Sequence, residues 1–222
     1  TSAGNPATWT SWLKSRGVTV VHVIANTRFA RKAEESGVDA VVAEGFEAGG
    51  HNGREETTTL CLVPMIRDTV SVPVIAAGGI GDGRSMMAAF ALGADGVQVG
   101  SRFAATVESS AHELFKQAIV RSAEGDTRLS MKALVPVRLL RNEFAEKVDA
   151  AEGRGAGRAE LLELLGRGRA KRGMYEGDMV EGELEIGQVS ARIHSVEPAG
   201  DVLKRIWQEF LEEKEKIANL EF

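Results

Sequence analysis

Residues 73–83 read PVIAAGGIGDG, a short apolar run that leads through four glycines into a helical pattern. Similar apolar runs lie on both sides of this stretch, each followed or preceded by a helical pattern. Strands that are apolar on both faces and alternate with helices indicate a parallel sheet covered by helices. The strands are expected over 18–24, 38–43, 74–77 and 96–99, and the helices over 27–36, 57–70 and 84–92.

The glycine-rich motifs follow the carboxyl ends of these expected strands, where (β/α)₈ barrels carry their sites. The expected fold class is therefore α/β, as a (β/α)₈ TIM barrel, although an open doubly wound sheet could also use five strands. Four clear strands, and a further one ending over Thr1–Gly4, fall short of eight. The chain is thus expected to hold the C-terminal part of the barrel of a longer protein.

Beyond Gly125 the strand pattern ends, and helices are expected instead. Residues 136–152 predict an amphipathic helix with Leu139, Leu140 and Phe144 on one face. Further helices are expected around 161–165 and from Pro198 onward, the last with an apolar stripe of Val202, Ile206, Phe210 and Ile217.

Composition excludes several classes of protein. The 222 residues carry 32 acidic against 27 basic side chains, a net charge of −5, which argues against general nucleic-acid binding. Apolar runs stay well below the ~18 residues of a membrane span. One cysteine fits a reducing cytosol, and residues 1–10 lack the pattern of a signal peptide. A cytoplasmic protein without membrane or nucleic-acid partners is expected.

The glycines after residue 77 suit a phosphate site. Backbone N–H groups can approach an anion closely at glycine, and the N-terminus of the following helix adds a favourable dipole. Residues 98–102 (QVGSR) end the next strand and offer two further N–H groups and a hydroxyl. The alternative is that these glycines only permit tight turns.

Residues 44–53 (EGFEAGGHNG) form a loop in which His51 can exchange protons near neutral pH, or can be an ordinary polar loop residue.

His22 is expected in the core or at its rim, His112 as a helix cap, and His194 in a helical stretch. Cys61 is expected to be buried on an apolar helix face. No pattern indicates a metal site or a serine nucleophile. Residues 154–172 form a basic stretch, which is expected to be a solvated face or a docking site for an acidic partner or a phosphorylated cofactor. Its basic residues are Arg154, Arg158, Arg167, Arg169, Lys171 and Arg172.

In this order, residues 44–53, 73–83 and 93–103 resemble the flavin-dependent barrel family of nitronate monooxygenases and type II enoyl-acyl-carrier-protein reductases. Residues 100–119 and 177–193 resemble the reductase branch, as does the short distance between His51 and Pro64.

The resemblance implies that FMN binds at the carboxyl ends of the strands and that His51 is the active-site histidine. The implied phosphate ligands are Gly78, Gly79, Gly100 and Ser101, with Gln98 and Val99 adjoining. The remaining implied flavin contacts are Glu44, Gly49, Gly50 and Gln188. Residues 1–126 would be barrel units, 127–186 a small helical substrate-covering domain, and 187–222 a return segment with the C-terminal helix packing on the barrel. A homodimer is implied as well.

The first expected function is an enoyl-acyl-carrier-protein reductase of fatty-acid synthesis, in which NADH or NADPH reduces the flavin and a trans-2-enoyl thioester is the substrate. His51 would supply a proton to the substrate or polarise its carbonyl. The second is a nitronate monooxygenase that uses O₂. The third is an inactive flavin- or phosphate-binding fragment, since family members have a further N-terminal third.

Overall fold

The computed structural model describes residues 1–2 and 4–220 and separates the chain into two compact units. The first unit consists of residues 1–47, 55–99 and 206–222. The second unit consists of residues 48–54 and 100–205. A short loop of the N-terminal half thus belongs to the same unit as the C-terminal half.

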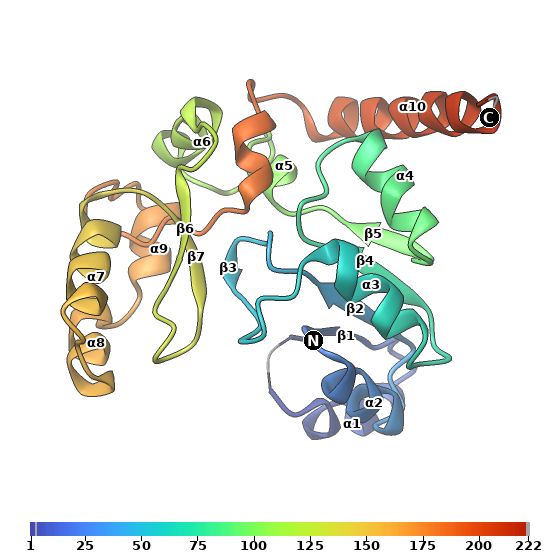
Figure 1. The fold of residues 1–222 in the computed structure, drawn as a ribbon, viewed down its shortest axis with the longest axis horizontal. Coiled ribbons are helices and arrows are strands. Elements are labelled where there is room, and N and C mark those ends of the chain that lie inside the picture. The colour runs from blue at the N-terminus through green and yellow to red at the C-terminus, as the bar shows by residue number, and fades with distance from the viewer. Residues whose placement is uncertain (3, 221–222) are drawn as a thin grey trace. The chain divides into compact units, whose positions relative to one another are not determined.

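The first unit is built on a four-stranded parallel sheet (Figure 1). Its strand order is β1-β2-β4-β5, and its strands are β1 (Val21–Ile24), β2 (Ala40–Glu44), β4 (Val74–Ala77) and β5 (Gly96–Gln98). All four expected strands are confirmed, with ends that shift by up to three residues. Ala3, within the further strand expected over Thr1–Gly4, lies outside the described residues, but the Val23 N–H donates to the Thr1 carbonyl at 2.9 Å.

Helices connect these strands as the alternation predicts. They are α2 (Thr27–Glu35), α3 (Thr59–Arg67) and α4 (Gly83–Ala91), preceded by η1 (Pro6–Thr8) and α1 (Thr10–Lys14). Helix α3 packs against β2 and β4 through Leu62, Val63 and Ile66. Cys61 lies off this buried face and is exposed, so the expectation of a buried thiol is wrong.

Two aspartates anchor the strands in the same way. The Asp39 N–H donates to the Val20 carbonyl at 2.7 Å, and the Asp39 carboxylate accepts from the Val20 N–H at 2.7 Å. Asp95 repeats this pair of hydrogen bonds with Val74, at 2.7 and 2.9 Å. Each aspartate follows a helix and a glycine turn, so each helix-to-strand connection is tied to the start of the preceding strand.

The second unit contains an antiparallel sheet of order β3-β7-β6. Its strands are β3 (Gly50–His51), β6 (Thr127–Ser130) and β7 (Val137–Leu140). The expected helix over 136–152 is therefore wrong in its first part, and strands do continue beyond Gly125. The reason is that β7 is buried on both faces: Val137 and Leu139 belong to one apolar cluster, and Leu140 belongs to another.

The helices of the second unit are α5 (Ser101–Ala104), α6 (Glu113–Arg121), α7 (Glu143–Gly153), α8 (Arg158–Leu165) and α9 (Arg169–Met174), with the turn η2 (Gln188–Arg192). Helix α7 begins where the Asn142 side chain accepts from the Ala145 N–H at 2.9 Å, which is ordinary N-terminal capping. Phe144 and Val148 of α7 and Leu161 of α8 pack with β7.

Helix α10 (Ala199–Ala218) contributes residues from Ile206 onward to the first unit. There Phe210 lies 5.4 Å from Phe90 of α4 between ring centroids, and Trp207 stacks on Phe210 at 5.3 Å. Val202 and Ile206 of the expected stripe are buried, whereas Ile217 is exposed. In the described part of the chain, none of the helices combines the length and the apolar character that crossing a membrane requires.

The compact units divide the chain at residues 99 and 205, not at 126 and 186 as the sequence suggested. One apolar cluster explains the difference, because it joins Phe115 and Ile119 of α6 to Leu184, Ile186 and Ile193. The loop 48–54 belongs to the second unit because β3 pairs with β7. The second unit is also not purely helical.

We expect Asp95→Ala to lower the free energy of unfolding by about 1–3 kcal/mol, because it leaves the buried Val74 N–H without its carboxylate acceptor. Urea unfolding followed by circular dichroism measures this. Asp68→Ala removes an exposed carboxylate just after α3 and should cost less than about 0.5 kcal/mol. Equal effects of the two substitutions would contradict the anchoring role.

Candidate active site

In the first unit, the loop after β4 approaches the loop after β2 so closely that only glycine fits. Gly78 and Gly79 have φ values of +96° and +71°. A Cβ at Gly78 would lie 2.8 Å from the Gly45 carbonyl oxygen, and one at Gly45 would lie 2.2 Å from the Thr59 hydroxyl. Glycine lets the backbone approach an anion closely, and turns with successive N–H groups commonly bind anions, so the turn of Gly78 and Gly79 is a candidate phosphate site.

Two side chains that sequence reasoning missed hold this loop. The Thr59 hydroxyl lies 2.9 Å from the Gly78 carbonyl and 3.2 Å from the Ala77 carbonyl. Glu47 accepts from the Thr59 N–H at 2.9 Å and so caps the start of α3. Its side chain also lies where a Cβ of Gly79 would project, at 3.3 Å. The only signal in the sequence was that Glu47 belongs to the loop 44–53.

The N-terminus of α4 is already occupied by carboxylates of the first unit. Asp82 accepts from the Ser85 N–H at 2.9 Å, and Ser85 completes a capping box with the Asp82 N–H. Glu209 accepts from the Gly83 N–H at 2.9 Å. The first N–H groups of α4 are thus engaged by carboxylates, and a contribution of this helix dipole to phosphate binding stays a prediction.

Glu44 ends β2 beside Ala77 of β4. Burial raises the pKa of Glu44 from 4.5 to about 7. Near neutral pH this carboxyl group can therefore donate or accept a proton at the carboxyl end of the sheet. Gln98, at the end of β5, is exposed, while Val99 packs against the core of this unit.

The other implied flavin ligands belong to the second unit. Gly100 is exposed, and a Cβ there would meet open space. The Ser101 hydroxyl accepts from the Gly187 N–H at 3.0 Å, which ties the start of α5 to the segment before η2. Gln188 is the exposed first residue of η2.

His51 is exposed and lies on β3, where it pairs with Val137. The buried Asn52 shapes its loop: the side-chain amide donates to the carbonyls of Ala48 and Gly50, both at 3.0 Å, and the Asn52 N–H donates to Pro136 at 2.8 Å. Asn52 was not among the expected residues, because its role depends on contacts that β7 brings to the loop.

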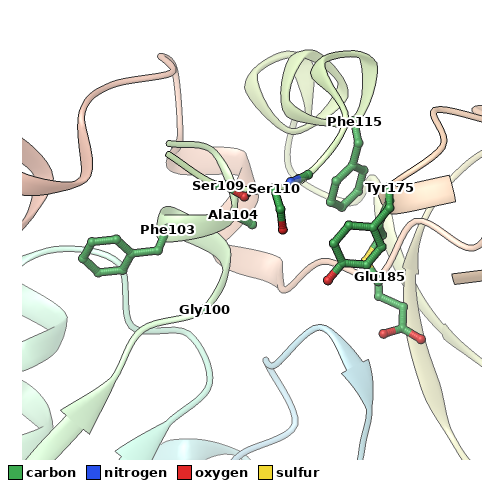
Figure 2. A pocket seen from close by; sticks show the side chains of 10 residues that line it. Gly100, Phe103, Ala104, Ser109, Ser110, Phe115, Tyr175 and Glu185 are labelled. Carbon is green, nitrogen blue, oxygen red and sulfur yellow. Dashed lines mark hydrogen bonds between the residues drawn. The ribbon is translucent and has the colours of Figure 1, made fainter. Parts of the chain in front are cut away.

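A pocket of about 360 Å³ lies within the second unit (Figure 2). Phe115, Tyr175 and Glu185 lie along one side of it, and Phe103 and Ala104 of α5 along the other. The remaining lining residues are Gly100, Ser109, Ser110, Ala111 and Met174. The walls are thus mostly apolar, with one carboxyl group and a few hydroxyl groups, which is the ordinary make-up of a small-molecule site.

The other histidines are structural or exposed. The His22 ring is buried with Nδ1 2.7 Å from the Thr1 hydroxyl, and burial lowers its pKa. His112 caps α6 as expected, since Nδ1 accepts from the Leu114 N–H at 3.2 Å. His194 is exposed and lies beyond η2 in irregular structure, not in a helix.

The basic stretch is largely paired within the second unit. Arg154 pairs with Glu160, Lys171 with Glu176, and Arg172 with Asp178, while Arg158 donates to the Ala133 carbonyl at 3.3 Å. Arg169 pairs with Glu181 at 3.2 Å and stacks over the Phe144 ring at 4.2 Å. Five of these six basic side chains are exposed, which agrees with the expectation of a solvated face, whereas Arg169 is half-buried.

Comparison with known proteins identifies the family. The family model of nitronate monooxygenases matches residues 1–209, so the chain belongs to this family. Probable nitronate monooxygenases of Staphylococcus haemolyticus and Staphylococcus aureus (strain Newman) are each 42% identical to it, over 151 and 153 residues. The alignments cover 64% of this chain and 42–43% of the relatives, so the chain spans less than half of their length.

Two solved structures are similar over nearly the whole chain. FabK from Thermotoga maritima is 42% identical with a TM-score of 0.91, covering 98% of this chain and 68% of FabK. A nitroalkane oxidase from Streptomyces ansochromogenes is 29% identical with a TM-score of 0.79, covering 97% and 63%. The α/β fold is therefore that of the barrel enzymes of this family, which are FMN-dependent oxidoreductases.

The residues of the chain fit such a cofactor. Gly78 and Gly79 form a glycine turn of positive φ whose N–H groups are candidate donors to a phosphate, and Gly45 and Gly78 leave no room there for a side chain. Glu44 adds a carboxyl group that can be protonated near neutral pH.

We expect Glu44→Gln to flatten the pH dependence of stability. Between about pH 4.5 and about pH 7 the folded protein keeps a proton on Glu44 that the unfolded chain releases. The stabilising contribution is therefore complete below about pH 4.5 and is lost as the pH rises through about 7. The change amounts to on the order of 3 kcal/mol, which Glu44→Gln should remove.

Urea unfolding at several pH values across this window measures the difference. Glu124→Gln, at an exposed glutamate, is the control and should follow the wild-type profile. Parallel profiles for Glu44→Gln and the wild type would contradict the assignment.

Proposed function

We propose that this protein is an FMN-dependent enoyl-acyl-carrier-protein reductase, which reduces trans-2-enoyl thioesters with NADH or NADPH in fatty-acid synthesis. The observation that carries the proposal is the similarity to FabK. At 42% identity and a TM-score of 0.91, this similarity exceeds the 29% and 0.79 of the nitroalkane oxidase, over almost the same part of the chain.

The pocket of the second unit supports a substrate with an apolar chain. Phe103, Phe115 and Met174 supply apolar surface, and small residues such as Ala104 and Ala111 leave space between them. Such walls bind an acyl chain by the hydrophobic effect and bind a small polar nitronate less well.

Different residues of this chain would have different roles in the reaction. A bound reduced flavin supplies hydride chemistry. Gly78 and Gly79 would bind the flavin phosphate through their N–H groups. His51 would deliver a proton to the α-carbon of the thioester, or donate a hydrogen bond to its carbonyl oxygen.

A nitronate monooxygenase is the second candidate, favoured by the family model and by the names of the staphylococcal relatives. In this reaction His51 would act as a base or as an electrostatic partner of an alkyl nitronate, and O₂ would serve as the oxidant in place of the nicotinamide.

Nicotinamide consumption by the FMN-reconstituted protein separates the candidates. Under anaerobic conditions we expect oxidation of NADH or NADPH that depends on an added trans-2-enoyl thioester. Oxygen uptake with propionate 3-nitronate, together with flavin that resists both nicotinamides, would instead establish the monooxygenase. Flavin binding without either activity would indicate a binding protein.

His51→Ala should leave flavin binding unchanged and lower enoyl turnover at least about a hundredfold, the usual contribution of a positioned proton donor. Stopped-flow absorbance with a saturating thioester measures the loss. His194→Ala, at an exposed histidine of the same unit, is the control and should turn over normally. Unchanged turnover in His51→Ala would remove His51 from the reaction.

Gly78→Ala should weaken FMN binding at least about tenfold, because its Cβ would collide with the Gly45 carbonyl and displace the N–H groups of the loop. Quenching of flavin fluorescence measures the affinity. Gly125 also has a positive φ, +84°, but open space around it. Gly125→Ala therefore carries the backbone strain alone and should bind FMN normally; equal losses in both variants would contradict a phosphate site at Gly78.

A further inference from the structure

Three residues lie at successive positions along the edge of β7 that faces away from β6. His51 pairs with Val137, Gly50 pairs with Arg138, and Glu185 forms an isolated antiparallel bridge with Leu139. In the direction of the chain, β3 joins β7 at Gly50, and Glu185 occupies the neighbouring position on the same edge of β7. Strand β7 therefore brings a histidine and a carboxyl group together from distant parts of the sequence.

Two glycines allow the close approach. A Cβ at Gly50 would lie 2.9 Å from Oε2 of Glu185, so the carboxyl group of Glu185 lies next to Gly50, the residue that precedes His51. A Cβ at Gly49 would lie 2.4 Å from the carbonyl carbon of Ile186. A side chain at Gly49 would collide with this backbone, and one at Gly50 would displace the Glu185 carboxyl group, so the loop of His51 packs closely against the segment of Glu185.

Glu185 is half-buried and is one of the residues that line the pocket (Figure 2). Burial raises the pKa of Glu185, and the positive charge that His51 can carry opposes that rise.

Other polar groups also lie near Glu185. Glu183, two residues earlier, is buried; burial and the charge of Glu185 raise its pKa to about 7, and the charge of Arg169 opposes that rise. Arg138, on the neighbouring position of β7, is buried with its guanidinium 3.5 Å from the Thr127 hydroxyl. Tyr175 contributes a phenol to the pocket wall. His51, at the other end of the same short stretch of β7, is a cationic group within electrostatic reach of Glu185.

We propose that Glu185 is a positioning residue for His51: its carboxyl group pairs with the imidazole and fixes the orientation of the ring. A carboxylate that holds a histidine in one orientation is a common device of acid–base sites. The catalytic part of this inference rests on the proposed function, whereas the pairing itself does not.

Carbon-13 NMR of carboxyl-labelled, flavin-free protein tests the pairing without substrate. The Glu185 signal is assigned by its loss in Glu185→Gln. In His51→Gln the titration midpoint of Glu185 should move to higher pH, because the opposing positive charge is gone. His194→Gln is the matched control and should leave the midpoint unchanged. An unmoved midpoint in His51→Gln, or an equal movement in both variants, would overturn the proposal.

Turnover of the FMN-loaded protein tests the positioning role. Glu185→Gln should lower kcat about tenfold or more, as expected for a group that orients a catalytic histidine. Glu183→Gln makes the same chemical change two residues away and should keep kcat within about twofold of the wild type. Equal losses in both variants would overturn the proposal, since they would reflect only damage to this segment.

A double variant shows whether Glu185 acts through His51. If it does, Glu185→Gln should have no further effect on kcat in a His51→Ala background, whereas independent effects would multiply. Multiplying effects would overturn the positioning role. A moved Glu185 midpoint in a wild-type protein that reduces no enoyl thioester would leave the pairing intact and reject the proposed function alone.

Discussion

The close backbone contact between Gly45 and Gly78 is the constraint on which the first unit depends. Neither residue can carry a side chain, because each Cβ would meet backbone or the Thr59 hydroxyl within 3 Å. Thr59 and Glu47 then fix the two loops through hydrogen bonds that also begin α3. The same contact that closes the strand ends thus also fixes the turn of Gly78 and Gly79, which is the phosphate site proposed above.

Strand β7 has the corresponding role in the second unit. One edge pairs with β6, and the other collects β3 and Glu185. Its two faces are covered by separate apolar clusters, so β7 cannot move without exposing one of them. The loop of His51 is therefore held by a strand that lies far from it in sequence, and its position depends on the packing of the whole unit.

This difference explains what the sequence could predict. In the first unit each strand, turn and helix follows from neighbouring residues, and the four strands were located by their apolar runs and glycines. In the second unit the run VRLL of β7 continues into the helical pattern of α7, so local periodicity extended the helix over the strand. The positions of Asn52 and Glu185 depend on their contacts with β7 and with the residues next to it. No local sequence pattern predicts these contacts, because the segments lie far apart in the sequence.

Sequence similarity does not distinguish between the two reactions that relatives of this chain are named for. The chain is 42% identical both to FabK and to staphylococcal relatives named as probable nitronate monooxygenases, so the shared motifs cannot select the reaction. These motifs fix backbone: Gly45, Gly78 and the strand ends. The pocket of the second unit is lined by apolar side chains, by the Glu185 carboxyl group and by the hydroxyl groups of Ser109, Ser110 and Tyr175. We infer that the choice of substrate depends on this wall, because its side chains can be exchanged without altering the contact between Gly45 and Gly78.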